Sequence, residues 1–391
     1  SSWEDDTLLD ADLPRNISDS KVRGIELEIE ALAKRLAPGE DQKRACQRCL
    51  ALLRSAVSAQ WGSRKGAPPP IVEVCGAAAQ GTDIDGSEFD VVLRLDHSIS
   101  VEEREAGIQE LRAKMQQPPH VQFLNVCDGM QLYPHTTAPL SVQLKAQGPA
   151  AESSKPLTMA HMLIASQPAH MSERPLSVDD VIKKMCDFTS ISRDLVRLVK
   201  LWATNLGLTA QHEGFMNGVA WTTLAIFYMQ KQQIMPPFAA FANNATPAPA
   251  IKTMTLLALF RGFFEFVAAR PNSNLRGLSV TQAQEYRAPA PVGAEHSGAS
   301  SAPLYLEDPA EFHETRQQRN LAETLGEQQW AKIVEEAKKA ADRLAARPQR
   351  WFHWAEILDP RVVPVDQIKK LQPLAEVVAE MSQKQDGEEQ A

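Results

Sequence analysis

The chain has 391 residues, which is too long for one ordinary hydrophobic core, so two or three domains are expected. Its 43% hydrophobic and 23% charged residues are typical of a soluble globular protein, and no uninterrupted apolar run reaches membrane-spanning length. The net charge of −8 excludes a strongly basic protein, although a local basic patch for nucleic acid is compatible with it.

The cysteines indicate an intracellular, reducing compartment. Five cysteines at irregular spacing argue against a disulfide framework. Cys46 and Cys49 form a Cys-x-x-Cys pair inside a helical pattern with no second pair, which favours ordinary helix-face cysteines over zinc or redox chemistry. The acidic N-terminus does not resemble a transit peptide, and the sequence does not distinguish mitochondrion from cytoplasm.

The pattern of elements predicts a mixed-sheet α/β head packed on a helical domain. After a flexible N-terminus over 1–17, the head is expected over 18–175, the helical domain over 176–371 with loops at 236–250 and 287–303, and a tail over 372–391. The head is expected to contain helices at 18–36, 40–60 and 101–116, strands at 71–75, 89–95, 121–126 and 140–145, and a loop at 76–87. Helices at 178–187, 192–206, 218–232, 251–268 and 326–346 are expected to form the second domain. The cleft between two such domains is the default binding site.

The segment Gly76–Asp90 carries the main chemical signal. A strand leads into a glycine-punctuated turn, and a second strand then opens with Glu88 and Asp90. Residues two apart on a strand face the same side, so both carboxylates can point into one site and hold Mg²⁺ against a nucleoside triphosphate. The glycines allow backbone amides to approach phosphate closely. The alternative interpretation is an edge strand with acids that face solvent.

This segment resembles the signature of the polymerase-β-like nucleotidyltransferases, in particular the poly(A) polymerases and terminal uridylyltransferases. The positions that match without a gap are Gly76, Gly81, Gly86, Ser87 and Asp90. Further similarities, in family order, lie at 195–203, 214–221, and 304–309 with 320–333. The resemblance implies that Lys200 contacts the triphosphate, Gln211 lies at the ribose position, and Gly218 and Val219 line the nucleotide pocket. It also implies magnesium, held by Glu88 and Asp90, and a nucleoside triphosphate as ligands.

The departures from the family pattern suggest a degraded active site. The phosphate-binding serine of the family is replaced by Ala77, and its first metal-binding aspartate by Glu88, whose carboxylate is set back by about 1.5 Å. The phosphate-contacting tyrosine is Thr209. The alternative interpretation of Lys200 is a surface lysine on an amphipathic helix. Asp83 and Asp85 are interpreted as turn acids.

The family's third acid, on a neighbouring strand, has no clear counterpart. One register places Tyr133 there, and another places Ser141 or Gln143; neither supplies a carboxylate. Asp128 is a substitute only if the hairpin is shifted. Without a third acid, a two-metal mechanism lacks a ligand and a base.

Three functions compete. The first is a pseudoenzyme that acts as a binding or structural subunit of an RNA-processing or ribonucleoprotein complex, with protein partners that supply a basic surface. The second is an active RNA 3′-terminal nucleotidyltransferase that transfers adenylyl or uridylyl groups, with Glu88 and Asp90 as its catalytic residues. The third is a nucleotide sensor or small-molecule nucleotidyltransferase. A membrane role is not expected.

Overall fold

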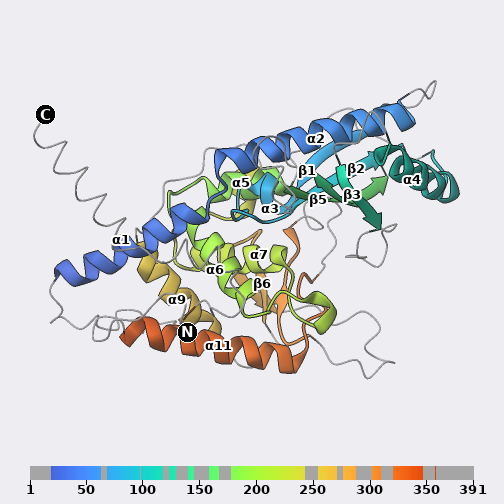
Figure 1. The fold of residues 1–391 in the computed structure, drawn as a ribbon. Coiled ribbons are helices and arrows are strands. Elements are labelled where there is room, and N and C mark those ends of the chain that lie inside the picture. Colours follow the sequence, from blue (N-terminus) through green and yellow to red (C-terminus); the bar gives the residue numbers. More distant parts are fainter. Residues whose placement is uncertain are drawn as a thin grey trace, which may run out of the picture.

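The protein folds as a mixed-sheet head packed against a larger helical body (Figure 1), as the sequence predicts. The structure is a computed structural model. It describes residues 19–62, 68–96, 98–117, 123–128, 140–144, 158–166, 178–242, 254–270, 276–287, 302–309, 320–346 and 357. The expected flexible N-terminus and tail lie outside these residues. The domain boundaries drawn from the sequence stay a prediction.

A five-stranded sheet forms the head, in the order β1-β2-β5-β4-β3. Only the central pair, β2 with β5, is parallel; the other neighbours run antiparallel. The head consists of α2 (Glu40–Trp61), β1 (Ile71–Cys75), α3 (Gly76–Gln80), β2 (Phe89–Leu95), α4 (Val101–Met115), β3 (Phe123–Asp128), β4 (Leu140–Leu144) and β5 (Thr158–Ser166). Because β2 and β5 are parallel, the chain crosses over the sheet between them.

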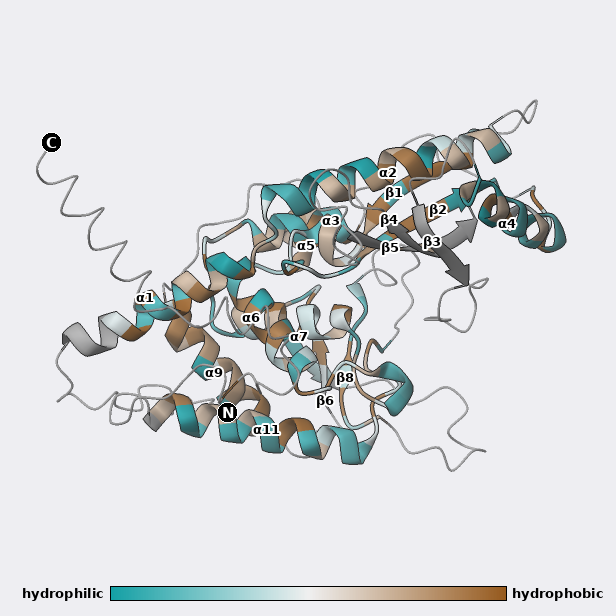
Figure 2. Ribbon diagram, in the orientation of Figure 1, coloured by the Kyte–Doolittle hydropathy of each residue, from teal (hydrophilic) through white to brown (hydrophobic). Residues whose placement is uncertain are grey.

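The sheet has one face that packs on helices and one that carries the polar residues. Alternate residues of β2, beginning with Phe89 and Val91, are buried and share a hydrophobic core with α2 and α4. The intervening Asp90 and Arg94 are only partly buried. Figure 2 shows the apolar residues of α2 facing the strands. The two-residue period of β2 therefore directs Asp90 to the face that α2 does not cover.

The larger core belongs to the helical body. It contains residues of α1 (Asp19–Leu36), α5 (Val178–Cys186), α6 (Ser192–Asn205), α7 (Gly218–Lys231), α8 (Phe238–Ala242), α9 (Leu256–Ala268) and α11 (Glu327–Ala346). Although α1 precedes the head in the chain, its apolar stripe, including Ile29 and Leu32, packs in this core. A small sheet in the order β7-β6-β8 lies beside the helices and comprises β6 (Arg276–Ser279), β7 (Gln284–Arg287) and β8 (Tyr305–Leu306).

Several predicted elements need correction. The loop expected over 76–87 begins with the five-residue helix α3, and α8 lies within the loop expected over 236–250. β5 and the small sheet were not predicted at all. The 3₁₀ helix Gln211–Glu213 was not predicted, and α9 begins five residues after the expected start at 251. The other described helices begin and end within two residues of the prediction.

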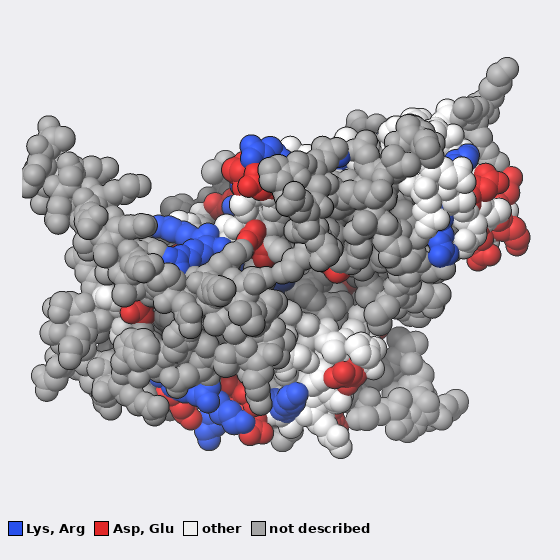
Figure 3. All heavy atoms as spheres, viewed as in Figure 1, with Lys and Arg blue, Asp and Glu red and all other residues white. Residues whose placement is uncertain are grey.

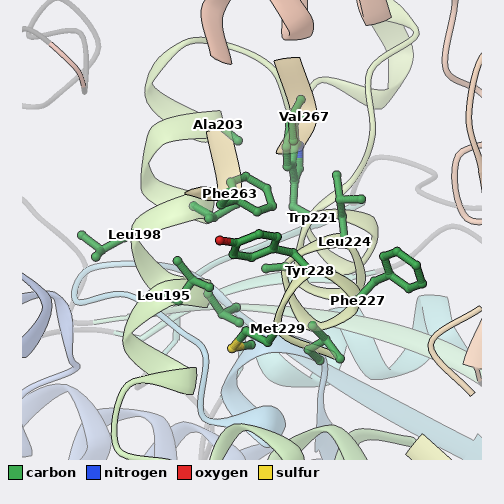
Figure 4. Close-up of a cluster of buried hydrophobic side chains, with 14 of the residues drawn as sticks. Leu195, Leu198, Ala203, Trp221, Leu224, Phe227, Tyr228, Met229, Phe263 and Val267 are labelled. Atoms are coloured by element: carbon green, nitrogen blue, oxygen red, sulfur yellow. The ribbon is translucent and has the colours of Figure 1, made fainter. Parts of the chain in front are cut away.

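Aromatic side chains from α7 and α9 interlock in the body core (Figure 4). The Tyr228 ring meets the Phe263 ring edge to face, with their centroids 5.8 Å apart. A methyl group at Gly262 would overlap the Tyr228 hydroxyl. Gly262 therefore allows the two helices to pack closely, which a larger residue would prevent.

We expect Gly262→Ala to lower the free energy of unfolding by about 1–3 kcal/mol, because an added core methyl group forces its neighbours to shift. Thermal and urea denaturation measure the change. The control is Gly24→Ala in α1, where no atom lies within 4 Å of the added carbon. This control should be neutral or stabilising, since alanine favours helix over glycine. Equal stability of the two variants would contradict the packing argument.

Candidate nucleotidyltransferase site

The turn that follows β1 brings the backbone close to Asp90. Gly76 has a φ of +64°, and a Cβ atom there would lie 3.0 Å from Asp90 Oδ2. Glycine is therefore needed both for the left-handed backbone and for the close approach of the carboxylate. Ala77 follows in the first turn of α3 and contributes no polar side chain. At the end of α3 the chain reverses at Gly81, whose φ is +71°.

Glu88 and Asp90 lie at the start of β2, but only Asp90 belongs to the strand. Phe89 is the first strand residue and is buried, Asp90 is partly buried, and Glu88 precedes the strand and is exposed together with Gly86 and Ser87. The expected pair of same-face acids is therefore only partly realised, because Glu88 lies in the turn rather than on the pleated strand.

β2 lies between β1 and β5, and the registers of both strands show which residues are next to Asp90: Cys75 on β1 and His161 on β5. Asp90 is paired directly with His161, which is paired in turn with Ser141 of β4. Strands in a sheet are about 4.8 Å apart, so Ser141 is about 10 Å from the Asp90 strand position. Asp128, on the far edge strand β3, is a further strand away. His161 therefore occupies the neighbouring position on β5, and neither it nor Cys75 carries a carboxylate.

The register that places Ser141 or Gln143 beside Asp90 is thus wrong, and the register that places Tyr133 there stays a prediction. Ser141 and Gln143 both lie on β4, which β5 separates from β2, and Asp128 is on the far edge of the sheet, so it cannot replace the missing ligand. Tyr133 lies outside the described residues. Among the residues that the structure describes, no group of three His, Cys, Asp or Glu side chains is arranged to hold a metal ion.

Lys200 of α6 lies next to the turn between α3 and β2 and to the start of α7, while its contact with a triphosphate stays a prediction. Its Nζ donates a hydrogen bond to the Thr82 carbonyl oxygen at 3.3 Å, and its Cε lies 3.9 Å from where a Cβ atom of Gly218 would be. Gly218 begins α7, which Asn217 caps by accepting a hydrogen bond from the Ala220 amide at 2.9 Å. The structure therefore brings Lys200 and the start of α7 together with the turn after α3.

Burial lowers the pKa of Lys200 to about 8 from its usual 10.5, while the nearby carboxylates of Asp83 and Asp90 act in the opposite direction. Between pH 8 and 10.5 the unfolded chain binds a proton at this lysine that the folded chain has released, so raising the pH stabilises the fold. We expect the stability of the natural chain relative to Lys200→Met to rise by about 2 kcal/mol between pH 7.5 and 10. Urea denaturation of both proteins at each pH measures it, and a constant or falling difference would contradict the burial of a charged amine.

For Gln211 and Val219, which are also expected at the nucleotide, the structure shows where each lies in its helix. Gln211 opens the short 3₁₀ helix Gln211–Glu213, whose following turn is held to the start of α11 by a hydrogen bond from the Gly326 amide to the Gly214 carbonyl. Val219 is the second residue of α7 and is partly buried. Contact of Gln211 and Val219 with a nucleotide stays a prediction.

Three residues that the sequence interpretation missed hold α3 and the turn between α3 and β2 in place. The Gln42 side chain accepts a hydrogen bond from the Gly86 amide at 2.7 Å and donates one to the Ser87 carbonyl at 3.1 Å. Arg197 donates from Nη2 to the Gly81 carbonyl at 2.9 Å and from Nε to the Asp83 carbonyl at 3.0 Å. Asp179 bonds to α3, as described below. All three are distant from the turn in sequence, so no local spacing could have indicated them.

A cavity of about 200 Å³ lies between α2 and this turn rather than between head and body. It is smaller than the roughly 300–1,000 Å³ of typical ligand pockets. The residues that line it are Pro38, Gln42, Lys43, Cys46, Gln47, Leu50, Val74, Ala78, Asp83 and Phe89. Asp90, Lys200 and Gly218 are not among them, so this cavity is separate from the candidate site.

The Cys-x-x-Cys pair behaves as ordinary helix-face residues. Cys46 and Cys49 both lie on α2, and neither forms a disulfide. Burial raises the pKa of Cys49 to about 12, which opposes formation of the thiolate that metal binding and redox chemistry need.

Several solved structures share this fold. A crystal structure of mtPAP in complex with CTP aligns with a TM-score of 0.65 and 15% identity, over 85% of this chain and 72% of that one. A cytoplasmic RNA terminal U-transferase aligns with a TM-score of 0.60 and 14% identity, over 88% and 99%. The Cid1 poly(U) polymerase, as a point mutant bound to MgATP, aligns with a TM-score of 0.62 and 14% identity, over 85% and 98%.

Neither a protein-family model nor a curated protein matches the sequence. At 14–15% identity the structural similarity establishes the fold alone. The chain therefore shares the fold of mtPAP and of the Cid1 poly(U) polymerase.

Proposed function

We propose that the chain is a pseudoenzyme with the fold of the poly(A) and poly(U) polymerases, and that it serves as a binding or structural subunit of an RNA-processing or ribonucleoprotein complex. The observation that carries this proposal is the pairing of Asp90 with His161 on the neighbouring strand. A metal clamp for phosphoryl chemistry needs several oxygen ligands held in a fixed geometry. Here Asp90 has an exposed, displaced Glu88 on one side and no carboxylate at the neighbouring position.

The donor set does not fit a catalytic magnesium ion with its nucleoside triphosphate. Two carboxylates remain, and Glu88 lies in the turn that precedes β2. Ala77 lacks the hydroxyl group that the family places near phosphate. Lys200 is already bonded to a backbone carbonyl. We therefore derive no catalytic step through a metal at this site.

The negative net charge of the chain supports a role in an assembly in which a partner protein makes the main contacts with RNA. The chain carries a net charge of −8, and phosphate contacts made by Lys and Arg dominate RNA affinity. On the face shown in Figure 3, described basic side chains gather over α1 at the left, acidic ones predominate over α4 at the right, and both signs are mixed over α11 at the bottom. A protein partner with a basic surface would meet this requirement. Within the described ranges, no helix is long and apolar enough to cross a membrane.

One observation favours the alternative, an active RNA terminal nucleotidyltransferase. Asp90, Lys200 and Gly218 come together around one turn, as the polymerase resemblance implies. In that case Glu88 and Asp90 would hold Mg²⁺ and Lys200 would contact the triphosphate of ATP or UTP. A reducing compartment, mitochondrial or cytoplasmic, suits both hypotheses.

The experiment replaces the chain in its native cells with Asp90→Asn or with the double variant Glu88→Gln/Asp90→Asn. We expect both variants to support growth, and to co-purify with RNA and protein partners to the same extent as the natural chain, because the acids have no catalytic task. Loss of growth with retained co-purification would overturn the pseudoenzyme proposal and support catalysis. A destabilised core variant, Trp221→Ala, controls for the sensitivity of the assay, since Trp221 is fully buried.

A further inference from the structure

A single carboxylate of the body bonds to two groups of the head. Asp179 is the second residue of α5, whose apolar residues Val181 and Ile182 belong to the body core. Its Oδ2 accepts a hydrogen bond from the Gly76 amide at 3.0 Å. Its Oδ1 accepts one from Gln80 Nε2 at 2.7 Å. Both donors belong to α3, so Asp179 spans the boundary between head and body.

Burial and the charge of the Asp179 carboxylate both strengthen these hydrogen bonds. Gln80 is only 2% exposed, and burial raises the pKa of Asp179, while the hydrogen bonds from Gln80 and Gly76 lower it. Hydrogen bonds to an ionised acceptor are stronger than neutral ones, and a low local dielectric strengthens them further. Breaking them without a replacement would leave a partly buried carboxylate unpaired.

Two cations of the body bond to the turn that follows α3. Arg197 donates hydrogen bonds to the carbonyls of Gly81 and Asp83, and Lys200 donates one to that of Thr82. Both cations belong to α6 of the body. Side chains of the body therefore bond to α3 and to the turn after it.

We propose that Asp179 is an internal latch that keeps head and body closed on each other without nucleotide. The latch would give a structural subunit a permanently closed shape. The inference therefore rests on the proposed function. The latch uses Asp179, which bonds to the first and last residues of α3, and the cations of α6, which bond to the turn after it, so no bound ligand is needed to bridge the two domains.

The test compares Asp179→Asn with Asp180→Asn by hydrogen–deuterium exchange of the full chain. Asp180 is the next residue of α5 and is exposed, so its variant makes the same change in charge. We expect the amides of residues 76–80 to exchange at least about tenfold faster in Asp179→Asn and unchanged in Asp180→Asn. Addition of MgATP to the natural chain should leave their exchange unchanged. Equal exchange in both variants, or marked protection by MgATP, would overturn the latch.

Gln80→Ala guards against a variant that merely fails to fold. It removes one bond and leaves the Gly76–Asp179 bond, so a folded protein with an intermediate increase in exchange is expected, and no increase would count against the latch. The outcomes separate the two proposals. RNA extension by the natural chain together with fast exchange in Asp179→Asn would reject the pseudoenzyme proposal and support the latch. No extension together with unchanged exchange in Asp179→Asn would support the pseudoenzyme proposal and reject the latch.

Discussion

The double variant Glu88→Asp/His161→Asp is expected to bind Mn²⁺ at least about a hundredfold more tightly than the natural chain. His161 is paired with Asp90, and paired strands lie about 4.8 Å apart, so an acid at 161 adds a carboxylate beside Asp90. Shortening Glu88 restores the side-chain length that the family uses. Loss of a residue that only orients a metal ligand changes affinity by roughly 10–100-fold, so gain of a ligand should exceed that range. Electron paramagnetic resonance of free Mn²⁺ measures the affinity.

The matched control is Glu88→Asp/Ser141→Asp. Ser141 is paired with His161 on the same line across the sheet but lies one strand farther from Asp90. It adds the same charge to the same sheet, so a purely electrostatic gain would appear in both double variants. Equal affinity in the two, or no gain in the first, would contradict the assignment of residue 161 as the missing metal position.

Replacement of Arg197 by methionine should lower the free energy of unfolding by about 3 kcal/mol. The Arg197 side chain is 9% exposed and makes two hydrogen bonds to carbonyls of the turn after α3. Each bond to a charged donor contributes roughly 1.5–3 kcal/mol, part of which methionine recovers through apolar burial. Urea denaturation gives the change, and exchange of the amides at 81–85 should quicken.

Arg193→Met is the control for this prediction. Arg193 lies one turn earlier on α6 and pairs with Asp187, with its side chain 31% exposed. Such a partly exposed ion pair contributes at most about 1 kcal/mol. If the two methionine variants are equally stable, the carbonyl contacts of Arg197 do not hold the turn.

The elements with clear periodicity were predictable from the sequence. β1, β2 and the long helices α2, α6, α7 and α11 begin and end close to the expected residues, because their apolar residues repeat over several turns or alternate along the strand. α3 was missed because five residues, Gly-Ala-Ala-Ala-Gln, which begin with one glycine of positive φ and end before another, carry no detectable period. The strands of the small sheet, two to four residues long, are likewise too short to leave a pattern.

The missing strand explains the error at the site. β5, with the sequence Thr-Met-Ala-His-Met-Leu-Ile-Ala-Ser, does not alternate between polar and apolar residues, as is common for a strand in the middle of a sheet. Without β5 the sequence pattern makes β4 the neighbour of β2, which places Ser141 and Gln143 one strand too close to Asp90. Only the resemblance to the polymerases predicted that Asp90, Lys200 and Gly218 lie close together; the local sequence pattern does not. Gln42, Arg197 and Asp179 act through groups far away in the chain, which only the fold reveals.

The most direct test of a retired catalytic site is extension of labelled oligo(A) and oligo(U) RNA primers by the purified chain. Each nucleoside triphosphate is supplied with Mg²⁺ or Mn²⁺, beside an Asp90→Ala control. The account predicts no growth of either primer above the Asp90→Ala background, and no shift in melting temperature caused by any nucleotide. Primer growth that Asp90→Ala abolishes would contradict it and would identify the nucleotide that the chain transfers.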